Sequence, residues 1–111
     1  GADFEAFLRD LRSSLPWLPE RLAYRLARSY GTRAKRLLGD SRSMHDLGEE
    51  VLPGLHAREI EYLRREEWSV TAEDILYRRS KLALHVPAGS EAHLDAWLSR
   101  HPFAGSSGAP M

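Results

Sequence analysis

The sequence predicts an all-α fold: a single compact bundle of five or six helices with a disordered C-terminal tail. Apolar residues recur three and four positions apart, the spacing that places them on one face of a helix. Capping residues stand where these segments begin, and Gly or Pro stands where they end. No stretch of useful length alternates apolar and polar residues as a half-buried strand does.

The composition is that of one ordinary globular domain. The 111 residues are enough for one core, and 42% hydrophobic and 29% charged residues are typical values. The absence of cysteine excludes disulfides and thiolate chemistry and fits a cytoplasmic protein. No apolar run approaches the ~20 residues of a membrane span, and no signal peptide is visible. Because the chain opens on Gly1 without an initiator Met, we expect a fragment of a longer protein.

Three helical segments are expected in the first part of the chain. Asp3 can cap a first helix, which Pro16 ends. Pro19 suits the first turn of a second helix, and Gly31 ends that helix as a left-handed cap. A short third helix then covers residues 32–38.

The middle of the chain is expected to form a helical turn, a tight turn and a longer helix. Residues 43–50 begin with Ser43 and carry Asp46 three positions later, which is a capping pattern. Pro53-Gly54 is typical of a turn. A longer helix is predicted from about Leu55 to Trp68.

The helix with the clearest start is predicted at about residues 72–84. Thr71 and Asp74 have the spacing of a capping box, in which each side chain binds a backbone N–H near the helix start. Arg79 lies in the middle of the apolar face of this helix. Burying a lone charge is costly, so Arg79 needs a carboxylate from another segment.

Glu59 is the expected partner, because it lies near the middle of the apolar face of the preceding helix. We therefore predict a structural ion pair between Glu59 and Arg79, or failing that between Glu59 and Arg78. The alternative is that Glu59 is a solvated surface residue.

The last helix is expected to be capped by Ser90, with Leu94, Trp97 and Leu98 on its inner face. The Gly-, Ser- and Pro-rich residues 102–111 are expected to form a disordered tail. The helical domain is thus predicted to cover residues 1–101.

Charge is uneven although the net charge is zero. Residues 21–42 carry seven basic side chains and one acidic one, and residues 43–67 carry seven acidic side chains and three basic ones. Pairing between the two segments is the simpler explanation. The alternative is that the basic segment Arg21–Arg42 meets an acidic partner, a phosphate or a membrane.

No catalytic, cofactor-binding or metal-ligating residue is predicted. The sequence has no glycine-rich nucleotide motif and no nucleophile elbow. Its five histidines do not stand at metal-ligand spacing. His56 is better explained as a hydrogen-bonded structural residue near the inner face of its helix.

Two alternative functions stay open, namely a stand-alone protein-interaction bundle and DNA binding through a helix-turn-helix over Leu22–Leu38. Ala27, Gly31 and Leu37 have the required spacing, and Arg33, Lys35 and Arg36 could contact phosphates. Against it, the second helix is short, carries no Asn or Gln for adenine readout, and belongs to a chain of neutral charge.

The stretch WSVTAEDILYRRSKLAL, Trp68–Leu84, resembles the C-terminal helical domain of bacterial FAD-dependent glycerol-3-phosphate dehydrogenases. Further matches occur upstream in the same order, and the resemblance covers roughly Leu11–Leu98. They are Tyr30-Gly31-Thr32, Leu37-Leu38, Asp46-Leu47-Gly48-Glu49, Glu59 and Tyr62-Leu63.

The resemblance implies a non-catalytic domain of a flavoenzyme that oxidises sn-glycerol 3-phosphate to dihydroxyacetone phosphate and passes electrons to quinone. The FAD and substrate sites would lie in an N-terminal flavin domain, which would be this domain's partner. The isolated chain is then expected to be inactive. The resemblance also implies peripheral binding to the inner face of the cytoplasmic membrane, and it leaves a homodimer open.

Overall fold

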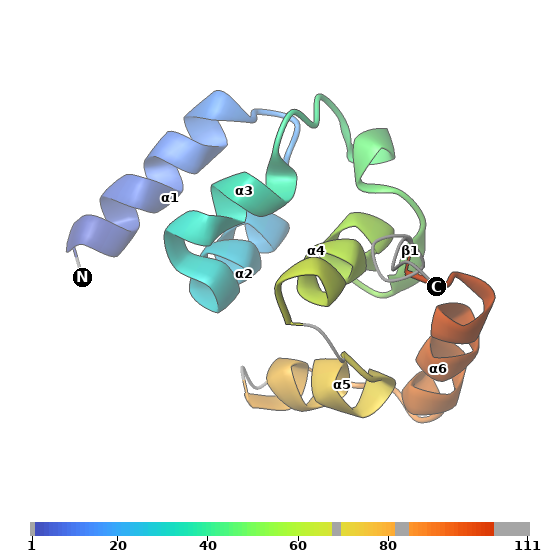
Figure 1. Ribbon diagram of the computed structural model, residues 1–111. Coiled ribbons are helices and arrows are strands. Elements are labelled where there is room, and N and C mark those ends of the chain that lie inside the picture. Colours follow the sequence, from blue (N-terminus) through green and yellow to red (C-terminus); the bar gives the residue numbers. More distant parts are fainter. Residues whose placement is uncertain (1, 68–69, 82–84, 104–111) are drawn as a thin grey trace. The chain divides into compact units, whose positions relative to one another are not determined.

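The structure is a computed structural model that describes residues 2–67, 70–81 and 85–103 (Figure 1). These residues form six α-helices, two 3-10 turns and a two-stranded hairpin, which confirms the predicted all-α class with five or six helices. The predicted tail lies outside the described residues from position 104 onward. The chain divides into two units, residues 1–49 and residues 50–111.

The first unit consists of helices that pack through small and branched apolar side chains. In order it contains α1 (Ala2–Ser14), α2 (Glu20–Tyr30), η1 (Gly31–Arg33), α3 (Ala34–Leu38) and η2 (Met44–Leu47). Helix α2 contacts both α1 and α3. The buried residues of this unit are Leu11, Leu18, Leu22, Ala23, Leu26, Ala27, Ala34, Leu37, Leu38, Ser41 and Leu47.

The helix ends of the first unit follow the prediction closely, with two shifts. Helix α1 begins at Ala2, so Asp3 lies inside the first turn, where a carboxylate favours the positive end of the helix dipole. Pro19 is the N-cap of α2 and not a residue of its first turn, because its ψ of 144° is extended. Gly31 ends α2 with a φ of 59°, as predicted for a residue without a Cβ, and its N–H donates to the carbonyl of Ala27.

The capping pattern predicted at Ser43 is formed in a shifted way. Ser43 is the N-cap of η2, as expected. The carboxylate of Asp46, however, accepts a hydrogen bond from the backbone N–H of Arg42 at 2.7 Å, one residue earlier than a capping box requires. This bond fixes the chain where it enters the turn.

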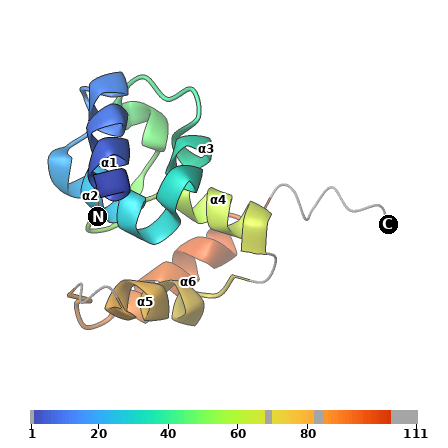
Figure 2. The ribbon, with the colours of Figure 1, turned by 90° about the vertical axis from the view of Figure 1, so that its left-hand side faces the viewer.

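The second unit consists of a small hairpin and three helices. It contains β1 (Glu50–Leu52), β2 (Leu55–His56), α4 (Ala57–Glu67), α5 (Ala72–Lys81) and α6 (Ser90–Arg100). Helices α5 and α6 contact each other, and both lie below α4 in Figure 2. The buried hydrophobic residues are Val51, Leu52, Leu55, Ile60, Tyr62, Leu63, Ala72, Ile75, Leu94 and Trp97.

The hairpin corrects the predicted start of the fourth helix. Strand β1 pairs antiparallel with β2, and Leu55 and His56 therefore belong to a strand, while the helix begins at Ala57. Pro53-Gly54 forms the predicted turn, with a φ of 77° at Gly54. The Glu50 carboxylate accepts the N–H of Gly54 at 2.8 Å, which stabilises the turn. Strands of two or three residues are too short to show an alternating pattern.

Helix α6 corrects a second prediction. Its N-cap is Gly89 in a left-handed conformation, with a φ of 86°, so Ser90 is the first helical residue instead of the cap. Ser90 is buried. Leu94 and Trp97 are buried, which confirms the predicted inner face, and Leu98 is half-buried.

Candidate functional site

The start of α5 forms the predicted capping box. The N–H of Asp74 donates to Thr71 Oγ1 at 3.1 Å, and the N–H of Thr71 donates to Asp74 Oδ2 at 3.3 Å. Two backbone donors that an isolated helix start leaves free are thus satisfied reciprocally. This arrangement fixes where α5 begins and therefore which side chains share its faces.

An ion pair joins the end of α4 to α5. Arg78 Nη2 lies 2.7 Å from Glu67 Oε1, and both side chains are partly exposed. Arg78, the alternative partner predicted for Glu59, forms its ion pair with Glu67. A partly exposed pair contributes little to stability, but it orients the two helices at their junction.

Arg79 reaches the hairpin turn. Its Nη2 donates to the carbonyl oxygen of Pro53 at 2.7 Å, and the same nitrogen lies 3.6 Å from the point where a Cβ on Gly54 would stand. Glu59 is buried in α4 with 6% of its surface exposed, which is unusual for a solvated residue. The ion pair between Glu59 and Arg79 stays a prediction. The carbonyl oxygen of Pro53 is an acceptor for Arg79 that could not be predicted from the sequence.

Arg64 of α4 is a buried, hydrogen-bonded arginine that was not predicted from the sequence. It is 8% exposed, and its guanidinium donates to the carbonyl oxygens of His101 at 2.5 Å and Leu98 at 3.1 Å. Leu98 lies in the last turn of α6, where its carbonyl also accepts the N–H of His101 at 3.3 Å, and His101 is the C-cap of that helix. The Cζ atom of Arg64 also lies 5.9 Å from the ring centroid of Trp97, and its Nη1 lies 3.4 Å from Glu61 Oε2.

The signal for Arg64 was present in the sequence. It follows Ile60 by four residues and is adjacent to Leu63, so it lies at the border of the apolar face of its helix. Like Arg79, a charged side chain at this position needs a partner from another segment. The carbonyl oxygens of Leu98 and His101 could not be predicted as its acceptors, because side-chain patterns do not show which backbone carbonyl a distant arginine reaches.

An aromatic pair completes the end of α6. The rings of Trp97 and His101 are stacked, with centroids 4.1 Å apart and an angle of 16° between the planes. His101 Nδ1 lies 2.9 Å from the carbonyl oxygen of Trp97. Trp97, His101 and the guanidinium of Arg64 therefore form one structural cluster.

The segment considered for DNA binding has the geometry of a helix corner. After α2, the chain forms η1 and then α3, which has five residues, three of them buried. Lys35 of α3 forms an ion pair with Asp10 of α1 at 2.6 Å and lies 5.8 Å from the ring centroid of Phe7. A helix this short, with a basic side chain held by α1, does not fit a recognition helix.

Two large apolar side chains among the described residues are well exposed, namely Tyr24 and Tyr77. Tyr24 packs edge-on against Phe4, with centroids 5.6 Å apart. Tyr77 is 63% exposed and lines an open depression of about 310 Å³ on α5. Among the described residues, Asp74, Arg78 and Lys81 also line it.

Within residues 2–67, 70–81 and 85–103, no three His, Asp or Glu side chains gather as metal ligands would. His56 is buried, but it belongs to strand β2 and not to a helix as predicted, and its hydrogen bond stays a prediction. Among the helices of the described part, none has the length and apolarity needed to span a bilayer.

Comparisons with known proteins agree with this architecture. Residues 1–98 match the family described as the C-terminal domain of alpha-glycerophosphate oxidase. A glycerol-3-phosphate dehydrogenase of Pseudomonas aeruginosa is 46% identical over 99 residues, and D-erythritol 1-phosphate dehydrogenase of Brucella abortus is 38% identical over 96. The aerobic glycerol-3-phosphate dehydrogenase of Escherichia coli is 34% identical over 96 residues.

These alignments cover 86–88% of this chain but 19% of each relative, so the chain spans about a fifth of the length of the relatives that it matches. The family match covers α1 to α5 and ends at residue 98, within the last turn of α6. The chain therefore belongs to the family of C-terminal domains of alpha-glycerophosphate oxidase.

Proposed function

We propose that this chain is the non-catalytic C-terminal helical domain of an FAD-dependent sn-glycerol-3-phosphate dehydrogenase. The parent enzyme would convert glycerol 3-phosphate to dihydroxyacetone phosphate and deliver electrons to quinone. This domain would pack against the N-terminal flavin and substrate domain of the same polypeptide. The similarity to glycerol-3-phosphate dehydrogenases of two bacteria over most of this chain is the observation that carries the proposal.

The contacts of the second unit support a structural role. Arg64 joins α4 to the end of α6, and Arg78 joins the end of α4 to α5. These arginines hold helices together, where a catalytic arginine would present its guanidinium to a ligand. We extend this structural role to Glu59 and Arg79, whose proposed ion pair would add a third connection.

The described residues do not fit a flavin site. A dinucleotide site needs a buried strand followed by a glycine-rich turn and a helix whose N-terminus faces the pyrophosphate. The strands in the described part form a short antiparallel hairpin, and its turn is Pro53-Gly54. We therefore assign FAD to the flavin domain and derive no step of its chemistry from this chain.

The remaining features of the proposal concern boundaries and location. We assign residues 1–101 to the helical domain and residues 102–111 to a C-terminal tail. The parent enzyme would bind peripherally to the inner face of the cytoplasmic membrane. A homodimer of the parent enzyme is compatible with this arrangement.

A comparison of two polypeptides tests the proposal. One is the complete product of the gene that encodes this chain, and the other lacks residues 1–111. We expect the complete polypeptide to retain flavin and to reduce a dye when glycerol 3-phosphate is added. The shortened polypeptide should lose flavin more readily. A shortened polypeptide with full activity and full flavin retention would refute the structural role.

Substrate identity is tested in the same assay. One relative is a D-erythritol 1-phosphate dehydrogenase, so both phosphates should be compared as substrates of the complete polypeptide. We expect a higher kcat/KM for glycerol 3-phosphate. A preference for erythritol 1-phosphate would keep the domain assignment and change the substrate of the parent enzyme.

A further inference from the structure

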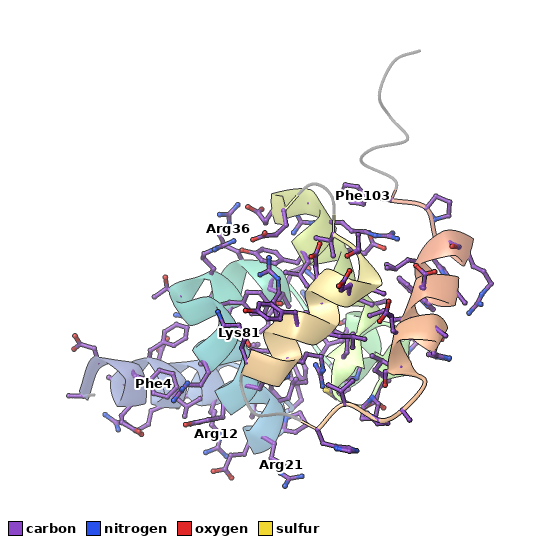
Figure 3. The ribbon with its side chains drawn as sticks, turned by 90° about the horizontal axis from the view of Figure 1, so that it is seen from below. Phe4, Arg12, Arg21, Arg36, Lys81 and Phe103 are labelled. Atoms are coloured by element: carbon purple, nitrogen blue, oxygen red, sulfur yellow. The ribbon has the colours of Figure 1, made fainter. Side chains whose placement is uncertain are left out.

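Two aromatic side chains form an accessible pair at the start of α1. Tyr24 of α2 is 45% exposed, and Phe4 is half-buried against it, with the two rings edge-on and their centroids 5.6 Å apart. Figure 3 shows Phe4 near the start of α1 and Arg12 farther along the same helix. Aromatic rings contribute strongly to the energy of binding surfaces. This pair is therefore a candidate contact for another segment.

The ring of Tyr24 is restricted by its neighbours before any partner binds. Nη1 of Arg28 donates to the hydroxyl of Tyr24 at 3.4 Å, and the Cζ atom of Arg28 lies 5.9 Å from the centroid of the ring. The edge-on contact of Phe4 adds to these two interactions. A side chain that is already ordered loses little conformational entropy on binding, so more of the energy gained by burying it remains.

Farther along α1, residues of the first unit itself cover the apolar face. Leu11 is buried. The Nζ atom of Lys35 lies 5.8 Å from the ring centroid of Phe7, and an ion pair of 2.6 Å with Asp10 fixes the lysine there. The accessible aromatic surface thus lies at the start of α1 and not along its whole length.

In the relatives, the rest of the enzyme joins this domain at the same place. The family is that of C-terminal domains, its match begins at residue 1, and the chain spans 19% of the length of each relative. Helix α1 begins at Ala2, two residues and ~3 Å of helix axis before Phe4. A polypeptide that leads into α1 therefore arrives beside the two rings, and it can cover them at the small entropy cost of a short loop.

Net charge does not select the occupant of this surface. The charged residues within four positions of Phe4 or Tyr24 are Asp3, Glu5, Glu20, Arg21, Arg25 and Arg28. Their formal charges sum to zero, so a charged segment gains nothing from net attraction. The rings offer apolar area, whose removal from water is favourable, and the matching occupant is therefore an apolar side chain.

We propose that the preceding segment, defined as the roughly ten residues before residue 1 in the complete polypeptide, folds onto the rings of Phe4 and Tyr24. It places an apolar side chain against them. The length follows from reach, because ten extended residues span up to ~35 Å, which is ample for a return path over one end of a helix. The inference rests on the proposed function, which places a flavin domain before this chain.

Photo-crosslinking in the complete polypeptide tests the contact directly. The photoreactive residue p-benzoylphenylalanine is placed at position 24, and in a control protein at position 12. The control is matched because the side chain of Arg12 is 47% exposed and lies on α1, ~12 Å of helix axis beyond Phe4. We expect position 24 to capture a peptide of the preceding segment, and position 12 to yield less of that peptide.

Proteolysis of surface variants provides an independent measurement. Tyr24→Ala in the complete polypeptide should raise the rate at which a protease of broad specificity cleaves the preceding segment, by about tenfold if the contact is worth ~1.4 kcal/mol. Tyr24→Phe keeps the ring and should leave the rate nearly unchanged, and so should the surface control Arg12→Ala. The crosslink from position 24 tests the contact without Tyr24→Ala, should that variant fail to fold.

The outcomes separate this inference from the proposed function. If the complete polypeptide retains flavin and oxidises glycerol 3-phosphate, but position 24 does not capture the preceding segment, the docking is overturned alone. A crosslink between two copies, seen as a doubled mass, also overturns it, and so does a cleavage rate that a folded Tyr24→Ala variant leaves unchanged. A complete polypeptide without flavin or dehydrogenase activity refutes the proposed function, whichever crosslink is seen.

Discussion

Replacing Arg64 tests whether the buried contact at the end of α6 stabilises the second unit. Arg64→Ala removes two hydrogen bonds from a charged donor to the carbonyls of Leu98 and His101. Each such bond contributes about 1.5–3 kcal/mol. Their sum is an upper bound, because His101 is exposed and water can reach its carbonyl. We therefore expect the free energy of unfolding to fall by ~3 kcal/mol, measured by urea denaturation followed by circular dichroism.

Neighbouring variants make this measurement specific. Arg65→Ala is the matched control, because Arg65 is 57% exposed and its distance to Glu66 is 3.9 Å. It should cost less than ~1 kcal/mol. Arg64→Lys should fall between the two, because a single ammonium cannot reproduce the planar fork that reaches both carbonyls. A loss below ~1 kcal/mol for Arg64→Ala would refute the stabilising role of the buried guanidinium.

Three further predictions concern the capping box, the proposed ion pair and the hairpin turn. Thr71→Ala and Asp74→Ala should each lower the free energy of unfolding by ~1 kcal/mol. The double variant should lose less than the sum, because the two hydrogen bonds form reciprocally. Strictly additive losses in urea denaturation would contradict this. Glu59→Ala should lower the free energy of unfolding by ~3–5 kcal/mol if the pair with Arg79 is buried. A loss below ~1 kcal/mol would rule the pair out, and so would the absence of coupling with Arg79→Ala in a double-mutant cycle. Gly54→Ala should lower the free energy of unfolding by ~1–2 kcal/mol because its φ of 77° is strained for a residue with a Cβ. Steric overlap adds nothing to this loss, because the new Cβ would lie at an ordinary 3.6 Å from Arg79 Nη2. An unchanged melting temperature would show that the turn adapts freely.

Local signals in the sequence predicted the helices and several of their ends. The capping box at Thr71 and Asp74, the turn at Pro53-Gly54 and the glycine end at Gly31 all depend on residues within a few positions of one another. Their side chains or missing Cβ atoms act directly on the neighbouring backbone. Such features can be predicted from one sequence because no distant segment is needed to form them.

Features that depend on distant backbone groups could not be predicted. The acceptor of Arg79 is the carbonyl of Pro53, 26 residues earlier, and the acceptors of Arg64 lie 34 and 37 residues later. A carbonyl oxygen is present at every residue, so the sequence does not mark which one receives a guanidinium. The need of Arg79 for a partner followed from its place on the apolar face of its helix, but the carbonyl of Pro53 as an acceptor did not.

The contact of Arg64 with the end of α6 also determines where this domain can be truncated. The family match stops at residue 98, but one of the two carbonyls bound by Arg64 belongs to His101, whose ring also stacks on Trp97. A gene fragment designed to end at residue 98 would remove that acceptor and that ring together. Expression boundaries for this domain should therefore include His101, even though sequence similarity alone would allow a shorter piece.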